Sequence, residues 1–188
     1  MAENIIPVEW KGEYVRLLDQ SKLPLEEIYL EIENVKEMWD AIKMLCVRGA
    51  PAIGIAAAYG VCIEMKHHVE ESVENYHKKL NETINYLATS RPTAVNLFWA
   101  LNRLKKVEKQ CENKKNLITQ EMLLKEAQSI EKDEEAVCIV IGENLLSLLH
   151  DGMTLLTHCN TGGIATVRYG TALSPILLGK ERGINFKV

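Results

Sequence analysis

The sequence predicts a mixed α/β fold, in which a small antiparallel sheet and a group of helices precede the beginning of a parallel sheet. Three patterns predict it. The first thirty residues contain short runs of alternating apolar and polar residues, which are typical of strands. Most of the chain that follows repeats apolar residues at helical spacing. Near the end, an apolar run, a glycine loop, a helical pattern and a second strand-like run follow the order of a βαβ unit.

Three strands are expected at the start of the chain. Residues 5–10 and 13–18 flank the turn Lys11-Gly12, and residues 27–32 place every second apolar residue on one face. Because a short glycine-containing turn joins the first two runs, we expect a small antiparallel sheet.

Two helices of different character are expected next. Asn34 suits an N-cap, and the amphipathic pattern after it ends near Val47. After a break at residues 48–50, Pro51 suits the first position of a helix that continues to Met65 and is apolar nearly all round. Such a helix belongs in the centre of a fold, so we expect its N-terminus to be a buried positive pole.

Three further helical segments follow. A polar amphipathic helix is expected over residues 73–87, a break at residues 90–93, and then a helix whose solvated end and following loop are the lysine-rich residues 105–115. The expected buried side chains are Val73, Tyr76, Leu80, Ile84 and Leu87 in the first helix and Ala94, Leu97, Phe98, Leu101 and Leu104 in the second. Residues 119–150 are predicted to be helical, either in one piece or broken near Lys132-Asp133.

The last part of the chain predicts a parallel sheet. Residues 153–158 are interpreted as its first strand, which we expect to be buried. Gly162-Gly163 is interpreted as a loop that opens a helix to about Lys180, and residues 184–188 as the start of a second strand. A βαβ unit that stops at its second strand cannot cover both faces of a sheet. We therefore expect the sequence to be a piece of a longer protein or to depend on a partner.

This pattern divides the chain into two domains. Residues 1–118 form the sheet-plus-helices domain, and residues 119–188 form a linking long helix with the first βαβ portion of the second domain.

Composition limits the partners and the location. A formal charge of −4 and a pI near 5.8 leave no broad basic surface, so nucleic acid is not expected as a partner. The longest apolar run, residues 50–63, is too short to cross a bilayer, and residues 1–4 lack the features of a signal peptide. The five cysteines contain no Cys-x-x-Cys pair, which favours free thiols in a reducing compartment. We expect a cytoplasmic protein that binds neither nucleic acid nor membrane.

The candidate site centres on Cys159, where the apolar run 155–158 ends and a loop of phosphate size begins. If this loop opens a helix, its free N–H groups and the helix dipole would attract an anion and favour the thiolate of Cys159. The alternative is a buried structural thiol. His158 points to the opposite face of a strand, which disfavours a Cys–His nucleophile pair. The stretch therefore predicts an enzyme that handles a small phosphorylated substrate.

Two arginines at breaks before helices are candidate anion ligands. Arg48 is either a cation at the C-terminus of the preceding helix or an anion clamp beside Pro51. Arg91 is either a surface loop residue or a second clamp. Together, two guanidinium groups would suit a phosphate and neighbouring hydroxyls.

No cofactor or metal is expected. The adjacent His67 and His68 diverge on a helix, and no third ligand has zinc-type spacing. Gly162-Gly163 lacks the G-x-G-x-x-G order of a dinucleotide site, and no nucleoside triphosphate loop is present in the sequence.

Four strings carry a resemblance to a known family. They are VRGAPAIG at residues 47–54, SRPTAVNL at 90–97, THCNTG at 157–162 and YGTAL at 169–173. They closely resemble the methylthioribose-1-phosphate isomerases, whose superfamily also holds ribose-1,5-bisphosphate isomerase and the regulatory subunits of initiation factor 2B. The resemblance runs in order across essentially the whole chain. It implies a Rossmann-like second domain, a cofactor-free aldose–ketose isomerase of methionine salvage, and a homodimer in the full-length protein.

The resemblance also implies residue roles. Cys159 would be one catalytic acid/base, and the second, an aspartate, would fall after Val188, so the 188-residue chain is expected to be inactive. The residues implied to bind the sugar phosphate are Arg48, Gly49, Ala50 and Arg91, and the predicted phosphate loop adds Asn160, Thr161 and Gly162. Arg168 and Pro175 depart from the family pattern and put the packing of the following helix in question. The alternative function is a non-catalytic regulatory or sugar-phosphate-binding module of the same superfamily.

Overall fold

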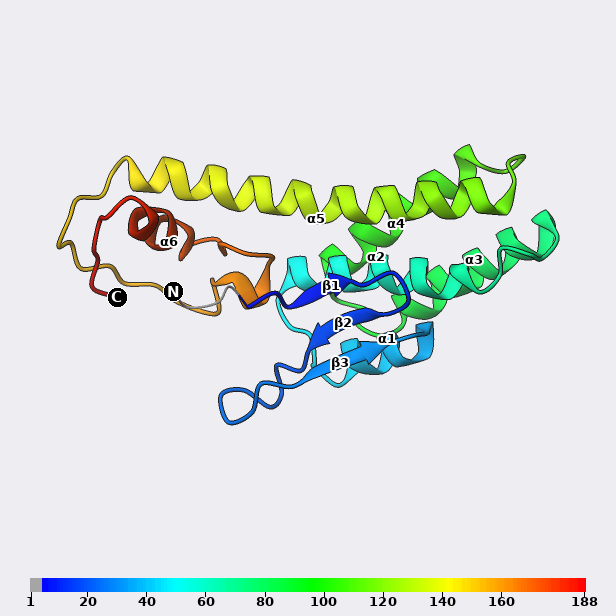
Figure 1. Ribbon diagram of the computed structural model, residues 1–188, viewed down its shortest axis with the longest axis horizontal. Helices are drawn as coiled ribbons and strands as arrows, with labels where there is room; N and C mark the ends of the chain where they lie inside the picture. The colour runs from blue at the N-terminus through cyan, green and yellow to red at the C-terminus, as the bar shows by residue number, and fades with distance from the viewer. Residues whose placement is uncertain (1–4) are drawn as a thin grey trace.

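Residues 5–188 are described by a computed structural model. Its strands are β1 (Val8–Trp10), β2 (Val15–Leu18) and β3 (Tyr29–Ile32), and its helices are α1 (Val35–Lys43), α2 (Ala50–Lys66), α3 (Val73–Ala88), α4 (Val95–Gln110), α5 (Asn116–Leu146), the 3₁₀ turn η1 (Gly163–Ala165) and α6 (Ser174–Glu181). The molecule is elongated (Figure 1). The sheet and α1 to α4 form a larger group, α6 belongs to a smaller C-terminal group, and α5 runs along both.

The N-terminal sheet is antiparallel with the order β1-β2-β3, as predicted. Val8 lies opposite Leu17, and Leu17 lies opposite Leu30 in the next strand. Val15 and Leu17 are fully buried because alternate residues of β2 face the helices. The predicted fold class is therefore confirmed for this part of the chain.

Helix α1 begins as predicted and ends earlier. The side chain of Asn34 accepts a hydrogen bond of 3.0 Å from the N–H of Glu37. The predicted end near Val47 is wrong, because Leu45 has a φ of 62° and the N–H of Cys46 donates to Ala41 O at 2.9 Å. A residue in the left-handed conformation, followed by a hydrogen bond back to the last helical turn, is a common end of a helix.

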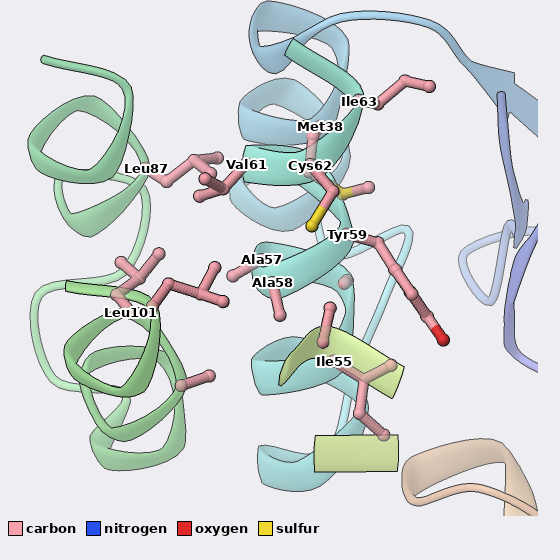
Figure 2. Close-up of a cluster of buried hydrophobic side chains, with 14 of the residues drawn as sticks. Met38, Ile55, Ala57, Ala58, Tyr59, Val61, Cys62, Ile63, Leu87 and Leu101 are labelled. Carbon is pink, nitrogen blue, oxygen red and sulfur yellow. The ribbon is translucent and has the colours of Figure 1, made fainter. Parts of the chain in front are cut away.

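Helix α2 is the centre of the larger group, as predicted, and its residues are buried from Ala52 to Met65. In Figure 2, Leu87 of α3 and Leu101 of α4 point toward α2, and Tyr59 points to the opposite side. The expectation of a buried N-terminus is wrong, because Ala50 is exposed. It directly follows the loop after α1, at the end of the larger group.

Two expected core residues lie at the surface. Val73 is 41% exposed in the first turn of α3, and Phe98 is 37% exposed on α4. The buried face of α4 instead includes Ala100, whose small side chain lies beside Gly54 and allows α2 and α4 to approach closely.

Helix α5 is one unbroken helix of 31 residues, so the alternative with a break near Lys132-Asp133 is wrong. Its first half contributes Leu123, Ala127 and Ile130 to the large hydrophobic core. Its second half packs on α6 in a separate cluster consisting of Cys138, Leu146, Tyr169 and Leu178.

The C-terminal segments pair in parallel, as predicted, but only through a single bridge between Thr154 and Lys187. The N–H of Leu155 donates to Lys187 O at 2.8 Å. The expected burial of the first strand is wrong, because Leu156 is fully exposed where no further strand or helix of the described residues covers it.

The expected continuous helix from the glycine loop to Lys180 is also wrong. Only the turn η1 follows the loop directly, and the chain is then irregular until α6. Pro175 lies in the first turn of α6, where its missing N–H has no helical partner to lose, so it does not disturb the helix. No helix among residues 5–188 has the length and apolarity needed to span a membrane.

Candidate functional site

Two loops meet beside the N-terminus of α2. We call residues 45–50 the arginine loop and residues 157–165 the cysteine loop. A Cβ atom added to Gly49 would lie 2.2 Å from Ala165 O, so the two backbones are in direct contact. Gly49 has a φ of 92°, which an L side chain rarely adopts. Figure 1 shows η1 beside the start of α2.

The arginine loop connects α1 with α2. Its Val47 is fully buried, whereas Arg48 is exposed and donates from Nε to Leu45 O at 3.3 Å. This contact fits the reading of Arg48 as a cation at the C-terminal end of α1. Gly49 then caps α2, and its carbonyl accepts from the N–H of Ile53 at 3.0 Å. The Arg48 side chain is therefore held against the end of α1, although its backbone directly precedes the N-cap of α2.

Arg91 occupies the turn before α4 and is half-buried. Its carbonyl accepts from the N–H of Ala94 at 3.0 Å. The first turn of α4 is close to α2, because a Cβ atom added to Gly54 would lie 2.9 Å from Asn96 O. Within residues 5–188, no hydrogen bond joins the side chains of Arg48, Arg91 and Cys159, so the structure brings together their elements but not these groups themselves.

Cys159 is an exposed free thiol with a φ of 69°. The alternative of a buried structural thiol is therefore wrong. The expected position at the start of a helix is also wrong, because η1 begins only at Gly163 and is a single turn. The helix-dipole argument for a thiolate consequently has no structural basis in this loop.

The cysteine loop packs against residues 168–171, which follow it in the chain. Thr161 O accepts from the N–H of Thr171 at 2.8 Å, and the hydroxyls of Thr157 and Thr161 are 3.0 Å apart. Cβ atoms added to Gly163 and Gly170 would each lie 2.3 Å from a carbonyl oxygen. The loop is therefore closely folded around Thr161, while Asn160 remains exposed.

Gln20 is a residue at this junction that the sequence patterns missed. It is only 6% exposed, and its Nε2 donates to Ile164 O at 3.0 Å. The preceding Asp19 accepts from the hydroxyl of Ser21 at 2.6 Å. Burial would raise the pKa of Asp19, but the hydrogen bonds from Ser21 outweigh it and hold that pKa below its usual value. The available signal was a polar pair, Asp19-Gln20, directly after a predicted strand.

A second polar cluster lies away from the two loops. Trp10 stacks on Tyr59 at 5.6 Å between ring centroids, and the Tyr59 hydroxyl donates to Glu131. Burial raises the pKa of both groups. These residues and Glu135 line a cavity of about 380 Å³ at the edge of the sheet.

The two adjacent histidines make separate polar contacts, and His67 Nε2 lies 3.2 Å from Glu33 O. His68 Nδ1 lies 2.6 Å from Glu71 and its Nε2 lies 3.4 Å from Glu64. Within residues 5–188, no cluster of three or more His, Cys, Asp or Glu side chains could hold a metal ion.

The two adjoining loops carry three kinds of chemical group. They are the exposed thiol of Cys159, the exposed guanidinium of Arg48 and the backbone N–H groups at the start of α2. A thiol can exchange a proton with a substrate, and a guanidinium beside a helix N-terminus can hold a phosphate.

A family profile described as "Initiation factor 2 subunit family" matches residues 46–188. The 5-deoxyribose 1-phosphate isomerase of Bacillus cereus ATCC 14579 is 45% identical over 188 residues, which are 100% of this chain and 54% of that protein. The methylthioribose-1-phosphate isomerase of Bacillus cereus ZK / E33L is 47% identical over 178 residues, covering 95% of this chain and 50% of that protein. The chain thus spans about half the length of the curated relatives it matches.

Two solved structures have the same fold. The 5-methylthioribose 1-phosphate isomerase of Pyrococcus horikoshii OT3 superposes with a TM-score of 0.92 at 33% identity, covering 97% of this chain and 51% of that one. The delta subunit of translation initiation factor eIF-2B from A. fulgidus gives 0.88 at 35% identity, covering 97% and 53%.

Proposed function

The chain belongs to the initiation factor 2 subunit family, and on that premise we propose that it is part of a sugar-phosphate isomerase. The proposed reaction converts 5-methylthioribose 1-phosphate to 5-methylthioribulose 1-phosphate in methionine salvage. The names of its relatives also include 5-deoxyribose 1-phosphate isomerase. The two sugars share the ring and the phosphate and differ only in the substituent at C5. The preferred substrate therefore depends on which C5 substituent the pocket accommodates.

The observation that carries the proposal is the contact between the two loops. The backbone of Gly49 packs on Ala165, so the loop with Arg48 adjoins the loop with Cys159. A sugar phosphate needs an anion ligand and an acid/base group on neighbouring surfaces. In the proposed site, Arg48 and Arg91 bind the phosphate, assisted by the backbone of residues 49–50 and 160–162.

The reaction needs no external oxidant or reductant. The bond from C1 to the ring oxygen breaks, and the ring oxygen gains a proton. A hydrogen moves from C2 to C1, and the C2 hydroxyl loses its proton to become a ketone. Cys159 is proposed as one group that exchanges these protons. The second acid/base belongs, by the resemblance, to a part of the protein after residue 188.

The wider proposals follow from the same family. Residues 1–118 would form one domain and residues 119–188 the beginning of a second, Rossmann-like one. The complete protein would be a cytoplasmic homodimer that binds a small sugar phosphate and neither nucleic acid nor membrane. The 188-residue chain alone would be inactive, because it would hold only one of the two acid/base groups.

A second candidate function is a non-catalytic module. Its supporting observation is the similarity to the delta subunit of eIF-2B, with a TM-score of 0.88. Such a module would bind a sugar phosphate or a protein without turnover. The exposed Cys159 in the cysteine loop favours the isomerase.

The deciding experiment is turnover of both sugar phosphates by the complete protein and by its Cys159→Ser variant. We expect turnover by the unmodified protein and a loss of about 10²- to 10⁴-fold in Cys159→Ser, which is the usual contribution of an acid/base group. Cys111→Ala removes a buried thiol at the end of α4 and is the control.

Binding of either sugar without turnover by the unmodified protein would favour the module. Absence of both binding and turnover would contradict the proposed function.

A further inference from the structure

We propose that Gln20 is a positioning residue, which locks the arginine loop to the cysteine loop and so aligns the phosphate ligand with the acid/base group. The inference rests on the proposed function of that junction. Gln20 lies 144 residues before Ile164 in the chain and reaches it through a side-chain hydrogen bond.

The contacts of Gln20 connect three segments. Its N–H donates to Cys46 O at 2.8 Å, in the arginine loop. Its Nε2 donates to Ile164 O at 3.0 Å, in the cysteine loop, and lies 3.5 Å from Arg48 O. One carboxamide therefore supplies N–H groups to the backbones of both loops.

The neighbours of Gln20 hold it rigidly. The N–H of Leu18, at the end of β2, donates to Pro7 O at 2.9 Å, and the N–H of Asp19 donates to Ile28 O at 2.8 Å. The Asp19 carboxylate accepts from both the N–H and the hydroxyl of Ser21. The backbone is thus fixed on both sides of Gln20, and its buried side chain has little freedom to move away from the junction.

The junction is sensitive to small displacements. Gly49 and Ala165 are packed without room for a methyl group, so even a small displacement of either loop alters this contact. Reacting groups that move by about 1 Å can lose about 100-fold in rate. Loss of the Gln20 hydrogen bonds would leave the Ile164 carbonyl without this donor and allow the loops to separate.

The chemistry of the carboxamide suits this role better than its close analogues. A glutamate at position 20 has nearly the same shape but would turn a carboxylate oxygen toward the carbonyls of Ile164 and Arg48. A methionine has similar length and offers no donor. Because Gln20 does not ionise, it acts through the two backbones and contributes no proton to the reaction.

The test compares Gln20→Glu and Gln20→Met with a matched buried glutamine. Gln120 is 8% exposed, and its Nε2 donates to Cys62 O at 2.8 Å inside the large core. Gln120→Glu and Gln120→Met therefore remove the same kind of hydrogen bond away from the two loops. Hydrogen exchange of the amides of Ala165 and Thr166 reports on the cysteine loop without requiring turnover.

We expect faster exchange at these two amides in both Gln20 variants. In the complete protein, we expect kcat/KM to fall by about 10- to 100-fold while the pH profile of the remaining activity keeps its shape. The Gln120 variants should lose thermal stability to a similar degree, yet keep the loop exchange and kcat/KM of the unmodified protein below their melting temperatures.

Unchanged loop exchange or unchanged kcat/KM in a folded Gln20 variant would overturn the inference, and so would equal effects of the Gln20 and Gln120 variants. A shifted pH profile would assign Gln20 a different role and would also overturn it. If the unmodified protein turns over neither sugar phosphate, the proposed function fails. Faster exchange in the Gln20 variants would still support the locking of the loops.

Discussion

Gly49 and Ala165 are in backbone contact across 116 positions of the chain, with no room for a side-chain carbon between them. Gly49 belongs to the loop before α2, and Ala165 ends the turn η1. This contact and the hydrogen bond from Gln20 to Ile164 hold the arginine loop and the cysteine loop side by side.

Gly49→Ala should therefore cost more than an ordinary glycine substitution. The positive φ and the overlap with Ala165 predict a loss of about 2 to 5 kcal/mol in the free energy of unfolding. Gly183→Ala is the control, because Gly183 has a similar φ of 78° with open space around it, and it should cost about 1 to 2 kcal/mol. Urea denaturation measures both. Equal losses would show that the close contact with Ala165 adds nothing to the cost in the free energy of unfolding.

The cysteines should differ in their reaction with a thiol reagent. Cys159 is exposed, whereas Cys62, Cys111 and Cys138 are buried. Burial, with Glu134 nearby, raises the pKa of Cys138 to about 11, so it is almost entirely protonated at neutral pH.

Alkylation of the native protein at about pH 7.5 should label Cys159 first. Mass mapping of the labelled peptides identifies the site, and unfolded protein, in which all five thiols react, is the control. Early labelling of Cys138 would contradict the packing of α5 on α6.

Glu131 should make the protein less stable as the pH rises. Burial raises the pKa of Glu131 above its unfolded value, and the hydrogen bond from Tyr59 offsets this only in part. The folded state then binds more protons than the unfolded state. The stabilisation from Glu131 is therefore complete below its pKa in the unfolded state, and it is lost as the pH rises through its pKa in the folded state.

Glu131→Gln keeps an acceptor for Tyr59 and cannot ionise. It should raise the melting temperature at pH 7 and change it much less at pH 4. Glu121→Gln, at an exposed position of the same helix, is the control for the change in net charge. A lower melting temperature for Glu131→Gln at pH 7 would contradict the assigned environment.

Gly142→Ala should loosen the C-terminal group. A Cβ atom at Gly142 would lie 2.3 Å from Ser174 Oγ, which donates to Cys138 O at 2.7 Å. Such overpacking usually costs about 1 to 3 kcal/mol. Hydrogen exchange should increase in α6 and remain unchanged in α2, which belongs to the separate large core. A uniform increase in both helices would contradict the separation of the two clusters.

Local patterns predicted the elements that depend on neighbouring residues. The N-cap at Asn34, the apolar helix α2 and the antiparallel sheet were all predicted, because capping, helical periodicity and alternation act over a few positions. The end of α1 was missed, because Leu45 adopts a left-handed conformation that its sequence does not signal. Phe98 was misplaced because it lies at the edge of the buried face of α4, which includes Leu97, Ala100, Leu101 and Leu104.

The roles of the candidate site residues remain predictions, and the sequence did not predict how their loops are arranged. The sequence by itself identified the motifs around Arg48, Arg91 and Cys159, because each combines reactive or charged groups with a break in periodicity. Only the tertiary structure decided that the arginine and cysteine loops adjoin, that Cys159 is exposed outside a helix terminus, and that Gln20 links the loops. The reason is physical: local propensities act within a few residues, whereas contacts across more than a hundred positions depend on how the helices pack.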